Sequence, residues 1–437
     1  MKITISERTP RRLSWSLSNV AGLIFLISLV SPFVGAIGHG LKTTWPAFLL
    51  WTLAIIFDRT VERKAILNVI VRQRFELLML VCWTLVVLIN FILGRGYTGG
   101  LHLINTLTFD MLVFFGIIYT AKKDDSYKIM AIWFFVLIGF EVIRSIPVIL
   151  SQPFLARNIT TTMSITSESA GLSSVGEYTY YTGLANIFPA LLGISLISSG
   201  FRKIELLLFC GFIGFAIAMS TLLGAFLLMI SGICFMFILT PILKYRLKLG
   251  PFLLLFIFII VAICVWQYYL NTSVQGFFLT EKLIRQVDSV FTRGLFLGDL
   301  TNRSALWEMS INTIQKYPFF GVGPSTGTYN PYYLTYVGGH SSWLDLPAEY
   351  GLIGFGFFVA FLFAAMKRTF NVFRYSKNIY SLGCIVSCII IIIGGSFNPS
   401  GIGSIAFTLV QFFVFSGRKE SIERNNSAIR RRYKWCY

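Results

Sequence analysis

The decisive stretch of this sequence reads Arg303-Ser-Ala-Leu-Trp307, then Tyr317-Pro-Phe-Phe-Gly-Val-Gly-Pro324, then His340-Ser-Ser-Trp343 and Ala348-Glu-Tyr-Gly-Leu-Ile-Gly354. These segments lie within Asn302 to Gly354, the longest polar interval in an otherwise apolar chain. A predominantly apolar chain keeps such an interval for a purpose, because polar groups near a membrane cost free energy. We interpret this interval as the outward-facing part of an active site.

The composition around this interval is that of a membrane protein. Of the 437 residues, 55% are hydrophobic and only 13% are charged, whereas soluble domains carry about 25% charged residues. Apolar runs of about 20 residues, the length that an α-helix needs to cross the hydrocarbon core, recur along the whole chain. The sequence therefore predicts an all-α polytopic membrane protein.

The apolar runs predict about twelve transmembrane helices in a single integral membrane domain that covers residues 1–437. Two longer polar connections are expected on the outer side. One is the Ser/Thr-rich loop 150–178, and the other is the large loop 271–345, which carries short helices and the decisive stretch. The expected spans are roughly 17–38, 43–57, 77–94, 103–121, 129–149, 179–199, 204–219, 222–241, 251–270, 346–366, 379–394 and 402–416.

The net charge of +18 follows from topology. A strongly basic chain is one signature of nucleic-acid binding, but here the basic residues lie in short loops between apolar runs. Lys and Arg accumulate in the cytoplasmic loops of membrane proteins, and a layout with the N-terminus inside puts most of them there. Both termini are therefore expected to be cytoplasmic, and no nucleic-acid partner is expected.

Cysteine and histidine usage predicts neither disulfides nor a metal site. Of the seven cysteines, Cys436 lies in the basic tail and the others lie inside apolar runs, so no disulfide framework follows. His39, His102 and His340 all face outward in the predicted topology, but they lack the spacing of zinc ligands. We predict no cofactor and no metal.

Charged residues near the outer side of the membrane are few and therefore informative. Glu141 and Arg144 lie three residues apart near the outer end of a span, a spacing that permits an ion pair on one helix face. Structural pairing and a supporting role in the site are both open for this pair. Asp110, in the middle of its span, is expected to be satisfied by a neighbouring helix.

An amphipathic helix is predicted between about Arg303 and Tyr317, with an N-cap at Thr301-Asn302 and an end at Pro318. The helix would bury one face against the membrane surface or the bundle. The residues of that predicted face are Leu306, Met309, Thr313, Ile314 and Tyr317.

Arg303 is a candidate anion ligand. A cation in the first turn gains nothing from the helix dipole, but the guanidinium and the free N–H groups of that turn can converge on phosphate. An ion pair with Asp299 or contact with a lipid headgroup is the alternative. Gly321-Val-Gly323 predicts a turn only, because no Lys-Ser/Thr follows it as in a phosphate-binding loop.

His340 is the candidate proton acceptor. It precedes a span, beside the candidate supporting residues Ser341 and Ser342, with Asp345 and Glu349 near the start of that helix. A neutral imidazole can take a proton from a hydroxyl. An exposed loop histidine is often only solvated, so the residues alone leave both interpretations open.

The ordered set Arg303-x3-Trp307, Tyr317-Pro-x2-Gly-x-Gly323 and His340-Ser-Ser-x6-Glu349-x-Gly-Leu-Ile-Gly354 resembles the signature loop of the O-antigen ligase/polymerase superfamily. The resemblance implies a multi-pass glycosyltransferase of the GT-C type in the bacterial inner membrane, which uses undecaprenyl-diphosphate-linked glycans without nucleotide sugar or metal. The two outer loops would then be periplasmic. Many relatives carry Ser-Arg-Gly where this chain reads Ser220-Thr-Leu-Leu-Gly224, so no role is carried over to that region.

By motif, the resemblance assigns diphosphate binding to Arg303 and an essential catalytic role to His340. A second diphosphate-binding arginine of the family lies in the earlier periplasmic loop, where Arg157 is the candidate by position. In the implied mechanism the arginines neutralise the leaving diphosphate, and His340 activates or orients the acceptor hydroxyl. Glu349 would hold the imidazole, and the anomeric centre would be inverted.

Two activities are open within the superfamily. A polymerase joins lipid-linked repeat units into a chain, and a ligase moves the finished chain onto lipid A–core. The His-Ser-Ser pattern, where ligases more often read His-Asn, and the 42 Phe residues favour an O-antigen polymerase, whose product would be O-antigen or a similar surface polysaccharide. A ligase is the first alternative, and a lipid-linked sugar or solute transporter is the alternative of another class, disfavoured because no matching halves are visible. The implied partners are the lipid-linked donor and acceptor, the flippase and chain-length regulator of the same pathway, and membrane lipid.

Overall fold

The computed structural model describes residues 16–30, 43–96, 99–122, 126–151, 178–198, 201–220, 223–242, 281, 284, 300–324, 329–330, 333–339, 341–376 and 378–397. Most of these residues are helical, and β1 (Tyr329–Asn330) and β2 (Thr335–Tyr336) form a small antiparallel sheet. The helices are α1 (Leu17–Val30), α3 (Thr44–Ile56), α4 (Arg63–Arg72), α5 (Arg74–Ile92), α6 (Gly99–Ala121), α7 (Ser126–Ser151), α9 (Tyr178–Ile197), α10 (Phe201–Met219), α11 (Leu223–Ile242), α14 (Leu300–Lys316), α15 (Ser342–Ser376) and α16 (Ile379–Phe397).

Six of the described helices are long and apolar enough to cross a membrane, namely α5, α6, α7, α9, α15 and α16. Three shorter apolar helices lie in α1, α3 and α11. An all-α, multi-pass membrane protein is therefore confirmed. The expected spans 251–270 and 402–416, most of the predicted loop 150–178 and part of the predicted loop 271–345 lie outside the described residues. The total of about twelve spans and the single domain stay predictions.

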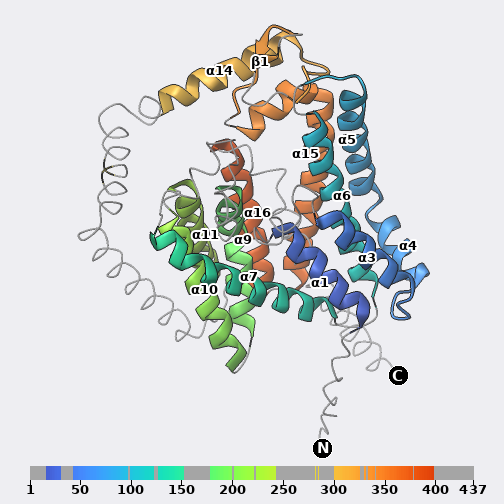
Figure 1. The fold of residues 1–437 in the computed structure, drawn as a ribbon, viewed down its shortest axis with the longest axis vertical. Helices are drawn as coiled ribbons and strands as arrows, with labels where there is room; N and C mark the ends of the chain where they lie inside the picture. The colour runs from blue at the N-terminus through green and yellow to red at the C-terminus, as the bar shows by residue number, and fades with distance from the viewer. Residues whose placement is uncertain are drawn as a thin grey trace, which may run out of the picture.

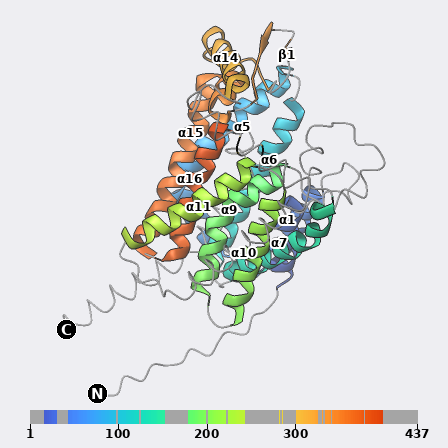
Figure 2. The same cartoon turned by 90° about the vertical axis from the view of Figure 1, so that its left-hand side faces the viewer.

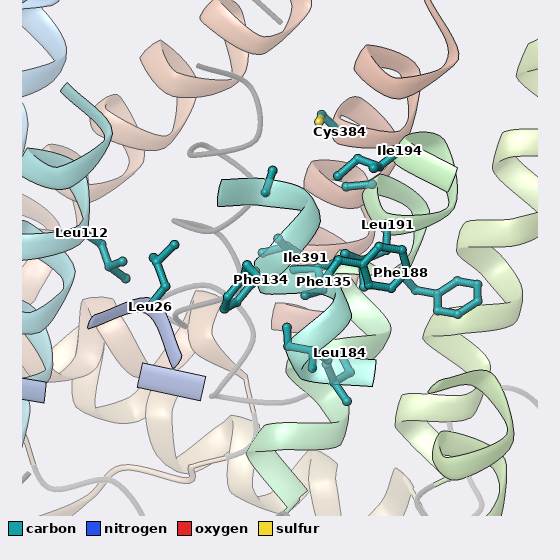
Figure 3. Close-up of a cluster of buried hydrophobic side chains, with 14 of the residues drawn as sticks. Leu26, Leu112, Phe134, Phe135, Leu184, Phe188, Leu191, Ile194, Cys384 and Ile391 are labelled. Carbon is teal, nitrogen blue, oxygen red and sulfur yellow. The ribbon is translucent and has the colours of Figure 1, made fainter. Parts of the chain in front are cut away.

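Helix α9 forms the centre of one half of the molecule, where it packs against α10, α11 and α16 (Figures 1 and 2). Glycine allows the closest of these approaches, because a Cβ at Gly383 of α16 would lie 2.3 Å from the carbonyl oxygen of Pro189. Large apolar side chains of α7, α9 and α16 fill the buried core beside this contact (Figure 3). The labelled members on these helices are Phe134, Phe135, Leu184, Phe188, Leu191, Ile194, Cys384 and Ile391.

The expected spans 204–219 and 222–241 are two helices, α10 and α11, as predicted. Their closeness in the sequence also predicts that the two pack together as a hairpin, and this prediction is wrong. Helix α10 packs mainly on α7 and α9, and α11 packs mainly on α9 and α16. The two helices touch each other only slightly, because α9 supplies apolar surface to both. The tertiary core therefore overrides the sequence proximity of the two helices.

The other half of the molecule is built on α5, α6 and α15. Trp83 of α5 contacts Tyr350 and Phe358 of α15, with ring centroids 4.8 and 5.0 Å apart. Helix α5 ends and α6 begins at the end of the molecule that carries α14 and β1 (Figure 1). The expected satisfaction of Asp110 is confirmed in part, because Thr84 of α5 donates a hydrogen bond of 2.9 Å to one of its carboxylate oxygens.

The span expected at 346–366 lies within a longer helix that could cross a membrane, and this helix contains a kink that was not predicted. Helix α15 runs from Ser342 to Ser376, and Gly351 inside it has φ 68° and ψ 174°, a conformation outside the helical range. A short helix before Gly351 therefore meets a long membrane-crossing helix at an angle. Only glycine adopts such a backbone without strain.

Two buried ion pairs close the end of the molecule away from α14. Lys122 Nζ lies 2.8 Å from Asp58 Oδ2, and Arg368 Nη1 lies 2.7 Å from Glu76 Oε1. Burial by itself raises the pKa of Asp58, but Lys122 and hydrogen bonds from Ser18 and Thr60 outweigh it and hold the pKa at about 2. These charges, which the sequence places in inner loops, are thus structural partners.

Candidate functional site

The polar interval folds into a compact cap at one end of the helices (Figures 1 and 2). We define the cap as residues 300–324, 329–330, 333–339 and 341–350, which comprise α14, the β1–β2 sheet, the glycine-containing turn and the first part of α15. Helix α14 ends at Lys316, directly before Tyr317 and Pro318, as predicted. Its start differs, since the helix begins at Leu300, so Thr301 and Asn302 lie within it and do not cap it.

Helix α14 is joined to the rest of the cap through hydroxyl groups. Ser310 Oγ donates to Asp345 Oδ1 at 2.9 Å, and Thr313 Oγ1 donates to the carbonyl oxygen of Tyr336 at 2.9 Å. Both hydroxyl-bearing residues are buried, whereas Met309 of the predicted apolar face is 39% exposed. Thr313 is thus buried as predicted, and the prediction is wrong for Met309, whose place is taken by Ser310, because paired polar groups satisfy buried backbone atoms of the cap that apolar side chains leave unpaired.

Asp345 organises the backbone on both sides of His340. Its carboxylate accepts the N–H of Gly339 at 3.1 Å on Oδ1 and the N–H of Ser341 at 3.0 Å on Oδ2. With the Ser310 hydroxyl on Oδ1, this buried carboxylate ties α14 to the segment that carries the candidate base. His340 itself lies outside the described residues. Asp345 was predicted near the start of the helix, but its contacts with Ser310, Gly339 and Ser341 were not predicted.

The turn at residues 317–324 completes the hydrogen bonds that the kink at Gly351 leaves open. The N–H groups of Val322 and Gly323 donate to the carbonyl oxygens of Ala348 and Glu349 at 3.1 and 2.8 Å. In return, Leu352 N–H donates to Pro318 O at 2.7 Å. The turn and the kinked helix therefore form one hydrogen-bonded unit.

Glycine is required in this unit for close packing as well as for turn geometry. Gly321 and Gly323 both have positive φ, as the predicted turn needs. A Cβ at Gly321 would lie 2.4 Å from the carbonyl carbon of Glu349, and one at Gly323 would lie 2.5 Å from that of Arg95. The Gly-Val-Gly segment thus joins the cap to α15 and to the loop between α5 and α6.

Glu349 lies beside His102 of α6, a contact that the sequence did not reveal. The side chain of Glu349 is almost fully buried, and its Oε2 lies 3.8 Å from Nδ1 of His102. The same ring nitrogen makes a hydrogen bond of 3.0 Å with the hydroxyl of Tyr350. His102 keeps 29% of its side chain exposed, so this carboxylate, imidazole and phenol form a group that solvent reaches through His102. The only earlier signal was a histidine predicted to face outward.

The remaining predicted site residues fall into two sets. Ser341 and Ser342 are buried at the start of α15, inside the cap. Arg303 lies on α14 near its first turn, but its side chain is outside the description, as is the whole of Arg157. The predicted contact of Glu349 with His340 stays a prediction, because His340 lies outside the described residues.

Glu141 and Arg144 lie away from the cap. Both belong to α7, which packs mainly on α1 and α10 and crosses the molecule far from α14 (Figures 1 and 2). The structure therefore does not bring this pair together with Glu349. Among the described residues, no three His, Cys, Asp or Glu side chains gather as a metal site would require.

Comparison with protein families gives one match. A model described as O-antigen ligase (Wzy_C) matches residues 206–359, from α10 through the cap and into α15. The match supports the O-antigen ligase/polymerase superfamily. It indicates an enzyme of surface polysaccharide biosynthesis and does not separate polymerase from ligase. A search of curated proteins gave no match.

Within this superfamily match, the cap is the part in which the signature segments meet. The segments 317–324, 338–339 and 341–349 are joined by the contacts described above. Trp307 of the Arg303-x3-Trp307 segment contributes a buried indole N–H, which has no hydrogen-bond partner within the described part of the chain. Because Arg303 and Trp307 are four residues apart on α14, they share one face of the helix.

Proposed function

We propose that this protein is an inverting O-antigen polymerase that joins undecaprenyl-diphosphate-linked repeat units at the periplasmic face of the bacterial inner membrane. The observation that carries the proposal is the clamp of Asp345. It holds the backbone on both sides of His340 and ties it through Ser310 to α14, the helix of Arg303. A fixed base and a fixed cation are what transfer from a diphosphate leaving group needs.

The leaving group would be bound at the start of α14. Arg303 stands one turn before Trp307 and two turns before Ser310 on the same helix face, about 10 Å from the Ser310 contact along the axis. The guanidinium would neutralise the diphosphate as the bond from the anomeric carbon to its oxygen breaks. The indole N–H of Trp307, which has no partner among the described residues, offers a second donor on that face. Arg157 is our candidate for the second cation.

The acceptor would be activated by His340. Its imidazole takes the proton of the acceptor hydroxyl as the oxygen attacks the anomeric carbon opposite the diphosphate, which leaves with the bonding electrons. The buried carboxylate of Glu349 would favour the protonated imidazole that this step creates. His102 lies beside Glu349, and the hydroxyl of Tyr350 is hydrogen-bonded to His102. These two side chains would therefore hold the carboxylate of Glu349 in place.

The test is the lipopolysaccharide ladder of a deletion strain complemented with single variants. Core carrying a single repeat unit in the deletion strain supports a polymerase. Arg303→Ala and His340→Ala should fail to restore long chains at a normal membrane level of protein. Lys316→Ala, which removes an exposed cation from the other end of α14, is the matched control and should restore them. Normal chain length with either site variant would contradict the assignment.

A ligase is the second candidate, favoured by the printed description of the matching family model. The same ladder separates the two activities. Bare core, with long chains accumulating on undecaprenyl diphosphate, supports the ligase. An unchanged ladder rejects both for O-antigen and directs the test to capsule and then to lipid-linked sugar transport.

A further inference from the structure

An exposed aromatic surface lies on the cap beside the kink of α15. Phe319 and Phe320 are 64% and 61% exposed, and Leu352 and Ile353 next to them are 51% and 39% exposed. The turn is fixed to the helix by hydrogen bonds from Leu352 N–H to Pro318 O and from Ile353 N–H to Phe319 O, of 2.7 and 3.4 Å. We call these four residues the phenylalanine patch.

The patch continues the apolar outer surface of the membrane-crossing helices. Helix α5 packs along α15, with Val86 beside Gly354. Exposed apolar side chains follow α5 at intervals of three or four residues over its whole length, which places them on one face. They are Phe75, Leu78, Val81, Leu85, Ile89 and Ile92.

The height of the patch fits the edge of the hydrocarbon layer. Between Leu352 and Arg368, α15 covers about 24 Å along its axis at 1.5 Å per residue. Arg368 is paired with Glu76 near the other membrane boundary, and the hydrocarbon core is about 30 Å thick. The turn bonded to Leu352 therefore reaches the outer part of that layer. Residues 317–324 and 350–366 contain no charged side chain, so nothing opposes their contact with hydrocarbon.

We propose that the phenylalanine patch inserts among the phospholipid acyl chains of the outer leaflet and anchors the cap to the bilayer. The occupant is bilayer lipid, because Leu352 of the patch lies on the same face of α15 as the exposed Phe363 and Phe370, along a helix that is apolar enough to cross the membrane. Aromatic side chains at a membrane boundary are favoured anchors. The inference does not depend on the proposed enzymatic activity, since it concerns only where the cap lies relative to the membrane.

Photo-crosslinking of the full-length protein tests the proposal. A p-benzoylphenylalanine residue replaces Phe319 or Phe320, and the protein is irradiated in vesicles of phosphatidylethanolamine and phosphatidylglycerol. Leu85 on the exposed face of α5 is the lipid-facing reference, and Gln315, exposed on α14, is the cap control that should face water. Intact-protein mass spectrometry should show an added phospholipid at both Phe positions and at Leu85, and none at Gln315.

Three results would overturn the proposal. If Phe319 and Phe320 form no phospholipid adduct, as is expected of Gln315, the patch faces water. Crosslinks to another polypeptide mean that it binds a protein or a second copy. Adducts that form only when polyprenyl diphosphate is added mean that it receives the lipid tail of a substrate. Because p-benzoylphenylalanine is aromatic and both positions are exposed, failure to fold is not expected, and near-native melting of each labelled protein checks this.

Discussion

Gly351→Ala is the sharpest test of how the cap is built. The backbone at this position has φ 68° and ψ 174°, a region that is essentially limited to glycine and costs another residue about 1–3 kcal/mol. The new Cβ would lie 2.0 Å from the carbonyl oxygen of Phe319, a backbone atom that cannot rotate away. The variant must therefore move the 317–324 turn away from α15.

Moving the turn breaks hydrogen bonds that join the two segments. Leu352 N–H to Pro318 O and Ile353 N–H to Phe319 O are the bonds closest to the clash, and each contributes about 0.5–1.5 kcal/mol. With the backbone strain, the cap contact should weaken by roughly 2–6 kcal/mol. A loss of about 3 kcal/mol would raise the open population of this contact roughly a hundredfold.

Hydrogen exchange read by mass spectrometry measures this opening directly. Amides of Val322, Gly323 and Leu352 should exchange faster in Gly351→Ala, while peptides of α9 stay protected, and long polysaccharide chains should be lost. Gly356→Ala in the same helix is the matched control, because a Cβ there meets nothing within 4 Å. It should be neutral or stabilising by up to about 1 kcal/mol. Equal exchange in the two variants would refute this account of the kink.

Four further variants concern ionisable groups. Asp345→Asn should speed exchange at Gly339 and Ser341 and reduce chain length, because one amide oxygen replaces two charged acceptors, each bond being worth about 1.5–3 kcal/mol. Glu349→Gln should abolish polymer on the ladder. His102→Gln should lower the rate of polymerisation, measured by the ladder, more than it lowers the amount of protein in the membrane, measured by immunoblot. Asp58→Asn should cost about 3–5 kcal/mol by leaving Lys122 buried without its partner. The pKa of Asp58 is lowered from 3.8 to about 2 in the folded protein, so the stability that Asp58 gives the fold is complete above pH 4 and is lost as the pH falls towards 2. Melting curves of wild type and variant against pH measure this loss.

Each of these predictions has a control or a contradicting result. Glu308→Gln removes an exposed carboxylate of α14 and should leave exchange in the cap unchanged. A full-length ladder with Glu349→Gln would remove that residue from the mechanism. A stability difference for Asp58→Asn that changes between pH 6 and 8 would contradict the pKa assignment, because a depressed carboxylate pKa produces no titration there.

The candidate site was predictable only where a motif is contiguous or a residue type is diagnostic. The segment ending at Pro318 and the glycines of the turn were readable, because helix termination and positive φ are local properties. The position of His102 beside Glu349 could not be predicted, since this contact joins α6 to α15, which are far apart in the sequence. The clamp by Asp345 was missed because an acidic residue near a helix start already has a local explanation. The burial of Ser310 on α14 was missed because a lone serine on a helix is ordinarily expected to be polar and exposed.

The sequence by itself determined that this is an all-α membrane protein, where many of its helices lie, and which polar interval is the candidate for the functional site. Run length and composition suffice for this, because the membrane imposes a fixed span length on every helix. Only the tertiary structure decided that α10 and α11 pack on α9, that Gly351 kinks α15, and that one carboxylate holds the backbone around His340. These features depend on how side chains pack and how backbone groups pair in three dimensions, which is fixed by close packing and by the need to pair every buried polar group.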